Sequence, residues 1–185
     1  MALTEEQEFI RQLLDPVTQN AAFQQMVRQY QRPLYNQIRS IVLNHDDADD
    51  VLQNTFVKVF RYLKDFKGDS KLFSWIYRIA TNESLSFLKQ KSKNFKMTGE
   101  TLQTRLVENL SADSFFDGDA LQFKLQKAVA LLPEKQQLVF KMKYYQEMKY
   151  EDISEILGTS VGGLKASYHH AVKKIEDYMN RELNH

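Results

Sequence analysis

The chain has 185 residues, of which 43% are hydrophobic, and its formal net charge is +1 at pH 7. This composition supports one good hydrophobic core or two small ones, which excludes a chain that is disordered overall. The absence of cysteine excludes disulfides, thiol nucleophiles and zinc–thiolate sites.

Long segments of the sequence are free of helix-breaking residues. Only six glycines and three prolines occur among many Gln, Lys, Glu and Leu residues, which favours helix over strand. No apolar run approaches the length needed to span a membrane, and the N-terminal sequence MALTEEQEFI is acidic rather than signal-like. We therefore expect an all-α protein without membrane insertion, located in the cytoplasm.

Two helices are predicted before residue 44. Thr4 and Gln7 form a capping-box pattern that opens a short helix ending before Pro16. A second helix is expected to start near Asn20, and Pro33 should kink or divide it. Its apolar face carries Phe23, Met26, Val27 and Tyr30 before the proline and Leu34, Ile38, Ile41 and Val42 after it.

Residues 44–50 are polar and acidic and are expected to form a junction. The next helix should cover residues 49–66, and the loop KGDS at 67–70 should follow it. The apolar spacing of this helix predicts a broad core stripe. The stripe comprises Val51, Leu52, Thr55, Phe56, Val59, Phe60 and Leu63.

The segment 66–93 joins that polar loop to an aromatic, basic helix. If residues 72–93 form one helix, a polar stripe recurs at spacings of three or four residues, opposite a buried face. Arg, Lys, Asn and Trp on one face can bind phosphate, hydrogen-bond a base edge and stack on an exposed base. An ordinary amphipathic helix with a solvated basic side is the alternative. The stripe comprises Trp75, Arg78, Asn82, Ser86, Lys89 and Lys93, and the buried face Phe73, Ile76, Ala80, Phe87 and Leu88.

Residues 96–120 lose the helical periodicity and carry an acidic excess, whereas the parts of the chain on either side are slightly basic. We interpret them as a flexible linker in which residues 101–110 could be helical. The plainest interpretation of this segment is a solvated tether with no further function.

A helix-turn-helix pattern lies in the last third of the chain. A helix over 121–132 is followed by Pro133 and a helix over 134–145. Gly158 then supplies a left-handed turn residue, and Ser160 is a good N-cap for the helix that follows. The apolar positions of the two motif helices are Ile153, Ile156 and Leu157, then Leu164, Tyr168, Ala171 and Ile175. A plain helical hairpin is the alternative.

Together the two signatures resemble the extracytoplasmic-function (ECF) group of bacterial RNA polymerase sigma factors, within the sigma-70 superfamily. DDADDVLQNTFVKVFRYLKDFKGDSKLFSWIYRIATN resembles region 2 of that family, and LLPEKQQLVFKMKYYQEMKYEDISEILGTSVGGLKASYHHAVKKI resembles region 4. The resemblance implies two small helical domains, a region 2 bundle at 1–95 and a region 4 helix-turn-helix at 121–185, joined by the linker.

The resemblance also implies roles for particular residues. Region 2 would dock on the clamp coiled coil of core RNA polymerase and capture bases of the melted −10 element, with Asn82 reading a base. The residues implied in polymerase docking are Asp49, Asp50, Gln53, Asn54 and Phe56. Those implied in −10 binding are Lys67, Asp69, Ser70, Lys71, Trp75, Arg78, Asn82, Lys89, Lys91 and Lys93. Asp46 and Asp47 lie just before the docking residues. Compensation of a helix dipole explains these two acids as well as polymerase docking does.

Region 4 would bind the −35 element through the start of its second motif helix. The implied contacts are Ser160, Gly162, Gly163, Lys165, Ala166, Ser167, His169, His170 and Lys173. Relatives commonly carry Arg where this helix has Ser167, His170 and Val172. We therefore expect an atypical −35 preference or a weaker dependence on that element.

The implied function is transcription initiation at specific promoters, with core RNA polymerase, duplex −35 DNA and single-stranded −10 DNA as partners. Relatives are commonly held inactive by an anti-sigma factor, so we expect one here. A helix-turn-helix repressor and a protein-interaction module are the alternatives. Four scattered histidines without cysteine supply no catalytic constellation, and no cofactor or metal is expected.

Overall fold

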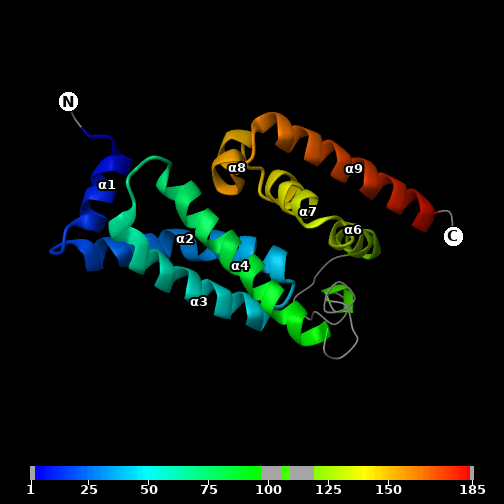
Figure 1. Ribbon diagram of the computed structural model, residues 1–185, viewed down its shortest axis with the longest axis horizontal. Helices are drawn as coiled ribbons and strands as arrows, with labels where there is room; N and C mark the ends of the chain where they lie inside the picture. Colours follow the sequence, from blue (N-terminus) through cyan, green and yellow to red (C-terminus); the bar gives the residue numbers. More distant parts are fainter. Residues whose placement is uncertain (1–2, 97–105, 109–118, 184–185) are drawn as a thin grey trace.

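The computed structural model describes residues 3–96, 106–108 and 119–183, and all secondary structure in these ranges is helical. The fold is all-α, with two helical domains (Figure 1). The N-terminal domain contains α1 Glu5–Leu14, α2 Gln19–Val42, α3 His45–Tyr62, a 3₁₀ turn at Leu63–Asp65, and α4 Leu72–Lys96. The C-terminal domain contains α6 Ala120–Ala130, α7 Glu134–Phe140, a π-helical turn at Lys141–Tyr145, α8 Tyr150–Leu157 and α9 Val161–Leu183.

The predicted capping box at the start of α1 is confirmed. The Gln7 backbone N–H donates to Thr4 Oγ1 at 3.2 Å, and the Thr4 N–H donates to Gln7 Oε1 at 2.9 Å. The helix ends at Leu14, before Pro16, as expected.

Pro33 does not divide the helix: α2 runs through this residue without interruption. A proline inside a helix costs about 3 kcal/mol relative to alanine. Met26 before the proline and Leu34 and Ile38 after it are all fully buried in the same core. Packing of both halves against one core outweighs the local cost, so the helix stays continuous.

The predicted junction at 44–50 is wrong, because α3 already begins at His45. The Asn44 side chain caps the helix by accepting from the Asp47 N–H at 2.9 Å. Asp46 and Asp47 lie in the first turn, where carboxylates interact favourably with the helix dipole. This position fits the alternative explanation for these two acids.

The predicted core stripe of α3 is correct except at Phe60. Val51, Thr55 and Val59 are buried, whereas Phe60 is 46% exposed. One edge of its ring packs against Phe23 at a centroid distance of 5.0 Å. The helical periodicity could not reveal this exposure, because Phe60 lies at the edge of the apolar face of α3.

The helix-turn-helix pattern in the C-terminal domain is confirmed. Gly158 has φ +63° at the end of α8, and the Gly163 N–H donates to Ser160 Oγ at 3.2 Å. A Cβ on Gly163 would lie 3.2 Å from Ser160 Oγ and 3.2 Å from Thr159 Cγ2, so a side chain at this position of α9 would require these neighbours to shift slightly. The expected helix over 134–145 is present as α7 and its π-helical turn.

The two domains pack directly against each other, which the sequence did not indicate. One core cluster joins residues of α2, α3 and α4 to Val139, Met142, Met148, Ile153 and Ile156 of the C-terminal domain. Helix α8 lies beside α4 (Figure 1). Within the segment expected to be a linker, residues 106–108 are helical, and Leu106 is buried with Leu43 and Ala130. The rest of the segment lies outside the described residues.

None of the helices in the described ranges is both long enough and apolar enough to cross a membrane.

Candidate nucleic-acid interface

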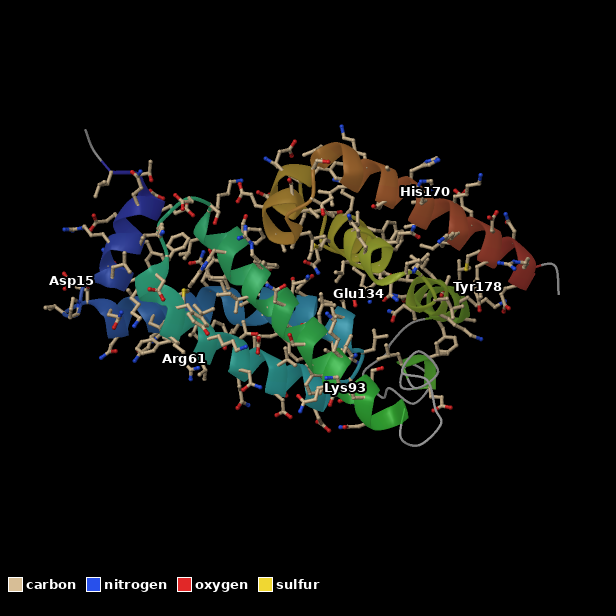
Figure 2. The ribbon with its side chains drawn as sticks, in the orientation of Figure 1. Asp15, Arg61, Lys93, Glu134, His170 and Tyr178 are labelled. Carbon is tan, nitrogen blue, oxygen red and sulfur yellow. The ribbon has the colours of Figure 1, made fainter. Side chains whose placement is uncertain are left out.

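Helix α4 has one exposed polar face along its length. The predicted stripe is confirmed at its five polar positions, and Ile76 and Ala80 on the other side are fully buried. Phe73, Phe87 and Leu88 are half-buried and pack on the core. Figure 2 shows Lys93 near the end of α4 that is farther from α8. The exposed stripe comprises Arg78, Asn82, Ser86, Lys89 and Lys93.

The loop before α4 is anchored by an aromatic pair. Phe66 is buried, and its ring centroid lies 5.0 Å from that of Trp75. Gly68 has φ +75°, a left-handed conformation that favours glycine and reverses the chain here. Lys67, Asp69 and Lys71 are exposed around this turn, and Ser70 is half-buried. Trp75 is itself half-buried.

Two of the predicted DNA-binding cations contact helix α8 of the other domain. Lys71 Nζ donates to Asp152 Oδ1 at 2.6 Å, and the Lys71 backbone N–H donates to Glu155 Oε2 at 3.4 Å. The hydrogen bond to Asp152 raises the pKa of Lys71. Arg78 Nε donates to the Glu155 carbonyl oxygen at 3.1 Å. These contacts occupy Lys71 in the loop and Arg78 at the N-terminal end of the stripe.

A third predicted cation, Lys91, forms an ion pair with Asp47 of α3. Its side chain is 27% exposed, whereas Lys89 and Lys93 are exposed. The sequence placed all three lysines in one basic cluster. The structure instead assigns Lys91 to the packing of α4 on α3, because its carboxylate partner lies on the neighbouring helix.

The residues predicted for polymerase docking share the outer side of α3. Asp50, Gln53 and Asn54 are exposed, and Phe56 is half-buried against Phe23. Asp49 is half-buried and lies 3.6 Å from His45 Nε2. Sequence reasoning missed Val57 and Phe60, which are 56% and 46% exposed on the same helix. Their exposure could not be inferred from an apolar residue type.

The start of α9 presents the predicted duplex-binding residues to solvent. All nine are exposed or half-buried, and only Gly163 and Ser167 belong to the half-buried group. Lys165 Nζ also lies 5.8 Å from the ring centroid of Tyr150, a weak cation–π distance. His169 and His170 lie with ring centroids 6.0 Å apart, and Figure 2 labels His170 on α9. In the described part of the chain, no group of three or more His, Cys, Asp or Glu residues is arranged to hold a metal ion.

Comparison with known protein families assigns both sequence signatures to the same family. The family model for Sigma-70 region 2 matches residues 26–94, and the model for Sigma-70, region 4 matches residues 122–175. The chain belongs to the sigma-70 family. Its region 2 contains the exposed stripe of α4, and its region 4 contains the helix-turn-helix.

Curated relatives of this sigma factor include proteins named as ECF RNA polymerase sigma factors. It is 28% identical over 156 residues to the ECF RNA polymerase sigma factor SigW of Bacillus subtilis, covering 80% of this chain and 83% of that protein. It is 27% identical over 184 residues to the RNA polymerase sigma-H factor of Pseudomonas aeruginosa, covering 94% of each. The sigma factor is therefore an ECF member and a transcription initiation factor, not an enzyme.

Solved structures share the fold. CnrH in complex with the cytosolic domain of CnrY matches with a TM-score of 0.69 at 20% identity, covering 95% of this chain and 97% of CnrH. The sigma factor RpoE in complex with the anti-sigma factor NepR, from Bartonella quintana, matches with a TM-score of 0.63 at 20% identity, covering 85% of this chain and 96% of RpoE.

Proposed function

We propose that this sigma factor binds core RNA polymerase in the cytoplasm, reads and melts the −10 element with region 2, and binds the −35 element with region 4. We assign residues 1–95 to the region 2 domain, 96–120 to the linker and 121–185 to the region 4 domain. The exposed polar stripe of α4, directly after the Gly68 loop, is the observation that carries the proposal.

The stripe combines a group that can read bases with groups that bind phosphate. The Asn82 amide can both donate to and accept from a base edge, whereas Lys89 and Lys93 supply positive charge without sequence information. The loop from Phe66 to Lys71 would hold the adjoining unpaired bases. The accessible part of the Trp75 ring would stack on one of them.

Binding alone can supply the free energy for promoter melting. Unpairing and unstacking a base costs a few kcal/mol, and stacking each exposed base on protein returns about 1–3 kcal/mol. The sequence contains no GxxxxGK[ST] phosphate loop, so the proposal requires no ATP-driven step.

The outer side of α3 is the proposed docking face for core polymerase. Asp50, Gln53 and Asn54 form its polar part, and Phe56 its aromatic part. Acids beside a partly buried aromatic ring complement a basic partner helix. Val57 and Phe60 extend this face with exposed apolar surface that docking would bury.

We expect this factor to depend weakly on the −35 element. Lys165, Lys173 and Lys174 are exposed cations of the recognition helix, and each missing phosphate contact reduces the salt-dependence slope by about one. Scrambling the −35 sequence of a mapped promoter should therefore reduce run-off transcription only modestly. A matched promoter with a scrambled −10 sequence is the control and should lose activity. A steep −35 requirement would contradict this expectation.

An anti-sigma factor is the third proposed partner. Both structural neighbours were solved as complexes, and RpoE was solved with the anti-sigma factor NepR. Between the two domains of this chain lies a cavity of about 910 Å³, lined by residues that include Tyr35, Arg39, Tyr77 and Lys141. Of these, Tyr35 and Arg39 are the half-buried aromatic and basic residues, whereas Tyr77 and Lys141 are buried. Affinity purification from cells before induction should recover a stoichiometric partner, and recovery of the chain alone would count against this proposal.

Run-off transcription with core polymerase on a genomic fragment library tests the function as a whole. A sigma factor should produce discrete start sites, each preceded by a common −10 sequence. A helix-turn-helix repressor should instead bind duplex DNA without polymerase and initiate nowhere. An interaction module should neither bind duplex DNA nor start transcription.

A further inference from the structure

Lys141 is a buried cation that has no counter-ion among the described residues. It is 5% exposed, its Nζ donates to Gln137 Oε1 at 3.2 Å, and no carboxylate in the described ranges forms an ion pair with it. An ammonium group carries three N–H donors, so the amide oxygen satisfies one of them. Buried charges in proteins are normally paired, and burial lowers the pKa of Lys141 to about 8. An anion bound beside Lys141 would supply both the charge and the acceptors.

The backbone that carries Lys141 departs from an ordinary α-helix. Residues Lys141–Tyr145 form a π-helical turn. Glu147, just after this turn, has φ +52°, a left-handed conformation that is uncommon for a residue with a side chain. Single π-helical turns occur frequently at functional sites. Lys141 and Tyr145 lie at the two ends of this turn and line the same cavity, so the turn brings a cation and an aromatic ring to one site.

That cavity, between the two domains, has the size and the lining of a site for an organic anion. Its volume is about 910 Å³, and ligand sites typically measure about 300–1,000 Å³. None of the described residues that line it is Asp or Glu, and Arg39 adds a second cation. The lining also contains aromatic and amide side chains, which bind planar rings and polar ring substituents. The aromatic side chains are Tyr35, His45, Phe73, Tyr77 and Tyr145, and the amides are Asn36, Gln122, Gln126 and Gln146.

Lys141 also lines a second cavity, of about 290 Å³, which suits such a ligand less well. Its lining includes Lys89, but also the carboxylate of Glu134, which repels an anion. None of the described residues that line this smaller cavity is aromatic, and aliphatic side chains such as those of Ile41 and Leu85 predominate. The larger cavity is therefore the better site for an anion that carries a planar ring.

We propose that the larger cavity binds a nucleoside phosphate. The phosphate accepts charge-assisted hydrogen bonds from Lys141. The base stacks on the ring of Tyr145, which is 39% exposed. Amide side chains of the lining, such as Gln126, donate to and accept from the edge of the base. Binding needs only the folded chain, so it does not depend on the proposed function.

Isothermal titration calorimetry of the full chain with AMP, GMP, CMP and UMP tests the proposal. At least one of these nucleotides should bind with a stoichiometry of one per chain. The matching nucleoside and inorganic phosphate should each bind at least about tenfold more weakly, because each lacks one half of the contacts. The absence of binding by any nucleotide at millimolar concentration would overturn the proposal. Binding that does not need both the base and the phosphate would also overturn it.

Two substitutions, each with a matched control, locate the bound nucleotide. Lys141→Met removes the ammonium group and should weaken binding by at least about tenfold. Lys135→Met, at an exposed position of α7, should leave the affinity unchanged. Tyr145→Leu removes the stacking ring and should weaken binding about fivefold or more. Tyr144→Leu, next to it but outside the cavity lining, should not. Unchanged affinity in both Lys141→Met and Tyr145→Leu would place the nucleotide elsewhere and refute the assignment.

Thermal unfolding separates lost binding from lost folding. A ligand that binds the folded state raises the unfolding midpoint. Excess nucleotide should therefore raise the midpoint of the unmodified chain and of Lys135→Met. Lys141→Met should keep a cooperative transition whose midpoint nucleotide does not change. A nucleotide-dependent rise of equal size in Lys141→Met would contradict a role for Lys141 in binding.

Discussion

Replacing Asn82 with alanine should flatten the −10 preference of this sigma factor. Asn82 is exposed at the middle of the α4 stripe, one turn from Arg78 and two turns from Lys89. Loss of a bidentate amide contact removes about 1–3 kcal/mol of discrimination between bases, equivalent to about five- to 150-fold. The measurement is run-off transcription on promoters that differ at single −10 positions. The ratio of transcription with the preferred base to transcription with the other bases should fall at one −10 position.

Two controls separate base choice from general binding. Asn94→Ala removes the same side chain at another exposed position of α4, away from the stripe, and should leave the preference unchanged. Lys89→Ala should weaken all promoters alike and lower the salt-dependence slope by about one. If Asn82→Ala also weakened all promoters equally, its assignment as a base reader would be wrong.

Replacing Lys141 with methionine should stabilise the folded chain at neutral pH. Burial lowers the pKa of Lys141 to about 8, against an ordinary value of 10.5. At neutral pH the buried ammonium therefore costs stability, on the order of 3 kcal/mol as an upper bound. Methionine fills a similar volume without a charge. Urea unfolding at pH 7 should show a higher midpoint for Lys141→Met.

The pH dependence of this gain has a defined sign. Because the folded-state pKa lies below the unfolded-state pKa, the cost is fully present below about pH 8 and disappears as the pH rises through the unfolded value. The advantage of Lys141→Met should therefore shrink between pH 8 and pH 10.5. Lys135→Met, at an exposed position, is the control and should show no such trend. A gain that is constant with pH would indicate packing rather than charge burial.

Features with local causes could be predicted from the sequence. The Thr4 capping box, the left-handed Gly158 and the Ser160 cap each depend on residues within four positions of one another, and all are present. The exposed stripe of α4 follows from helical periodicity alone. Where local signals competed with packing, prediction failed: Pro33 is held inside α2 by burial on both sides, and Phe60 lies at the edge of a core whose extent depends on α2.

The sequence by itself determined the all-α class, the order of the two signatures and the family. Only the tertiary structure decided which cations are available: Lys91 pairs with Asp47, Lys71 with Asp152, and Lys89 and Lys93 remain exposed. The physical reason is that an exposed lysine and one paired with another helix have the same local sequence requirements. Their partners lie on other helices, 44 residues away for Lys91 and 81 for Lys71, so only packing brings the charges together.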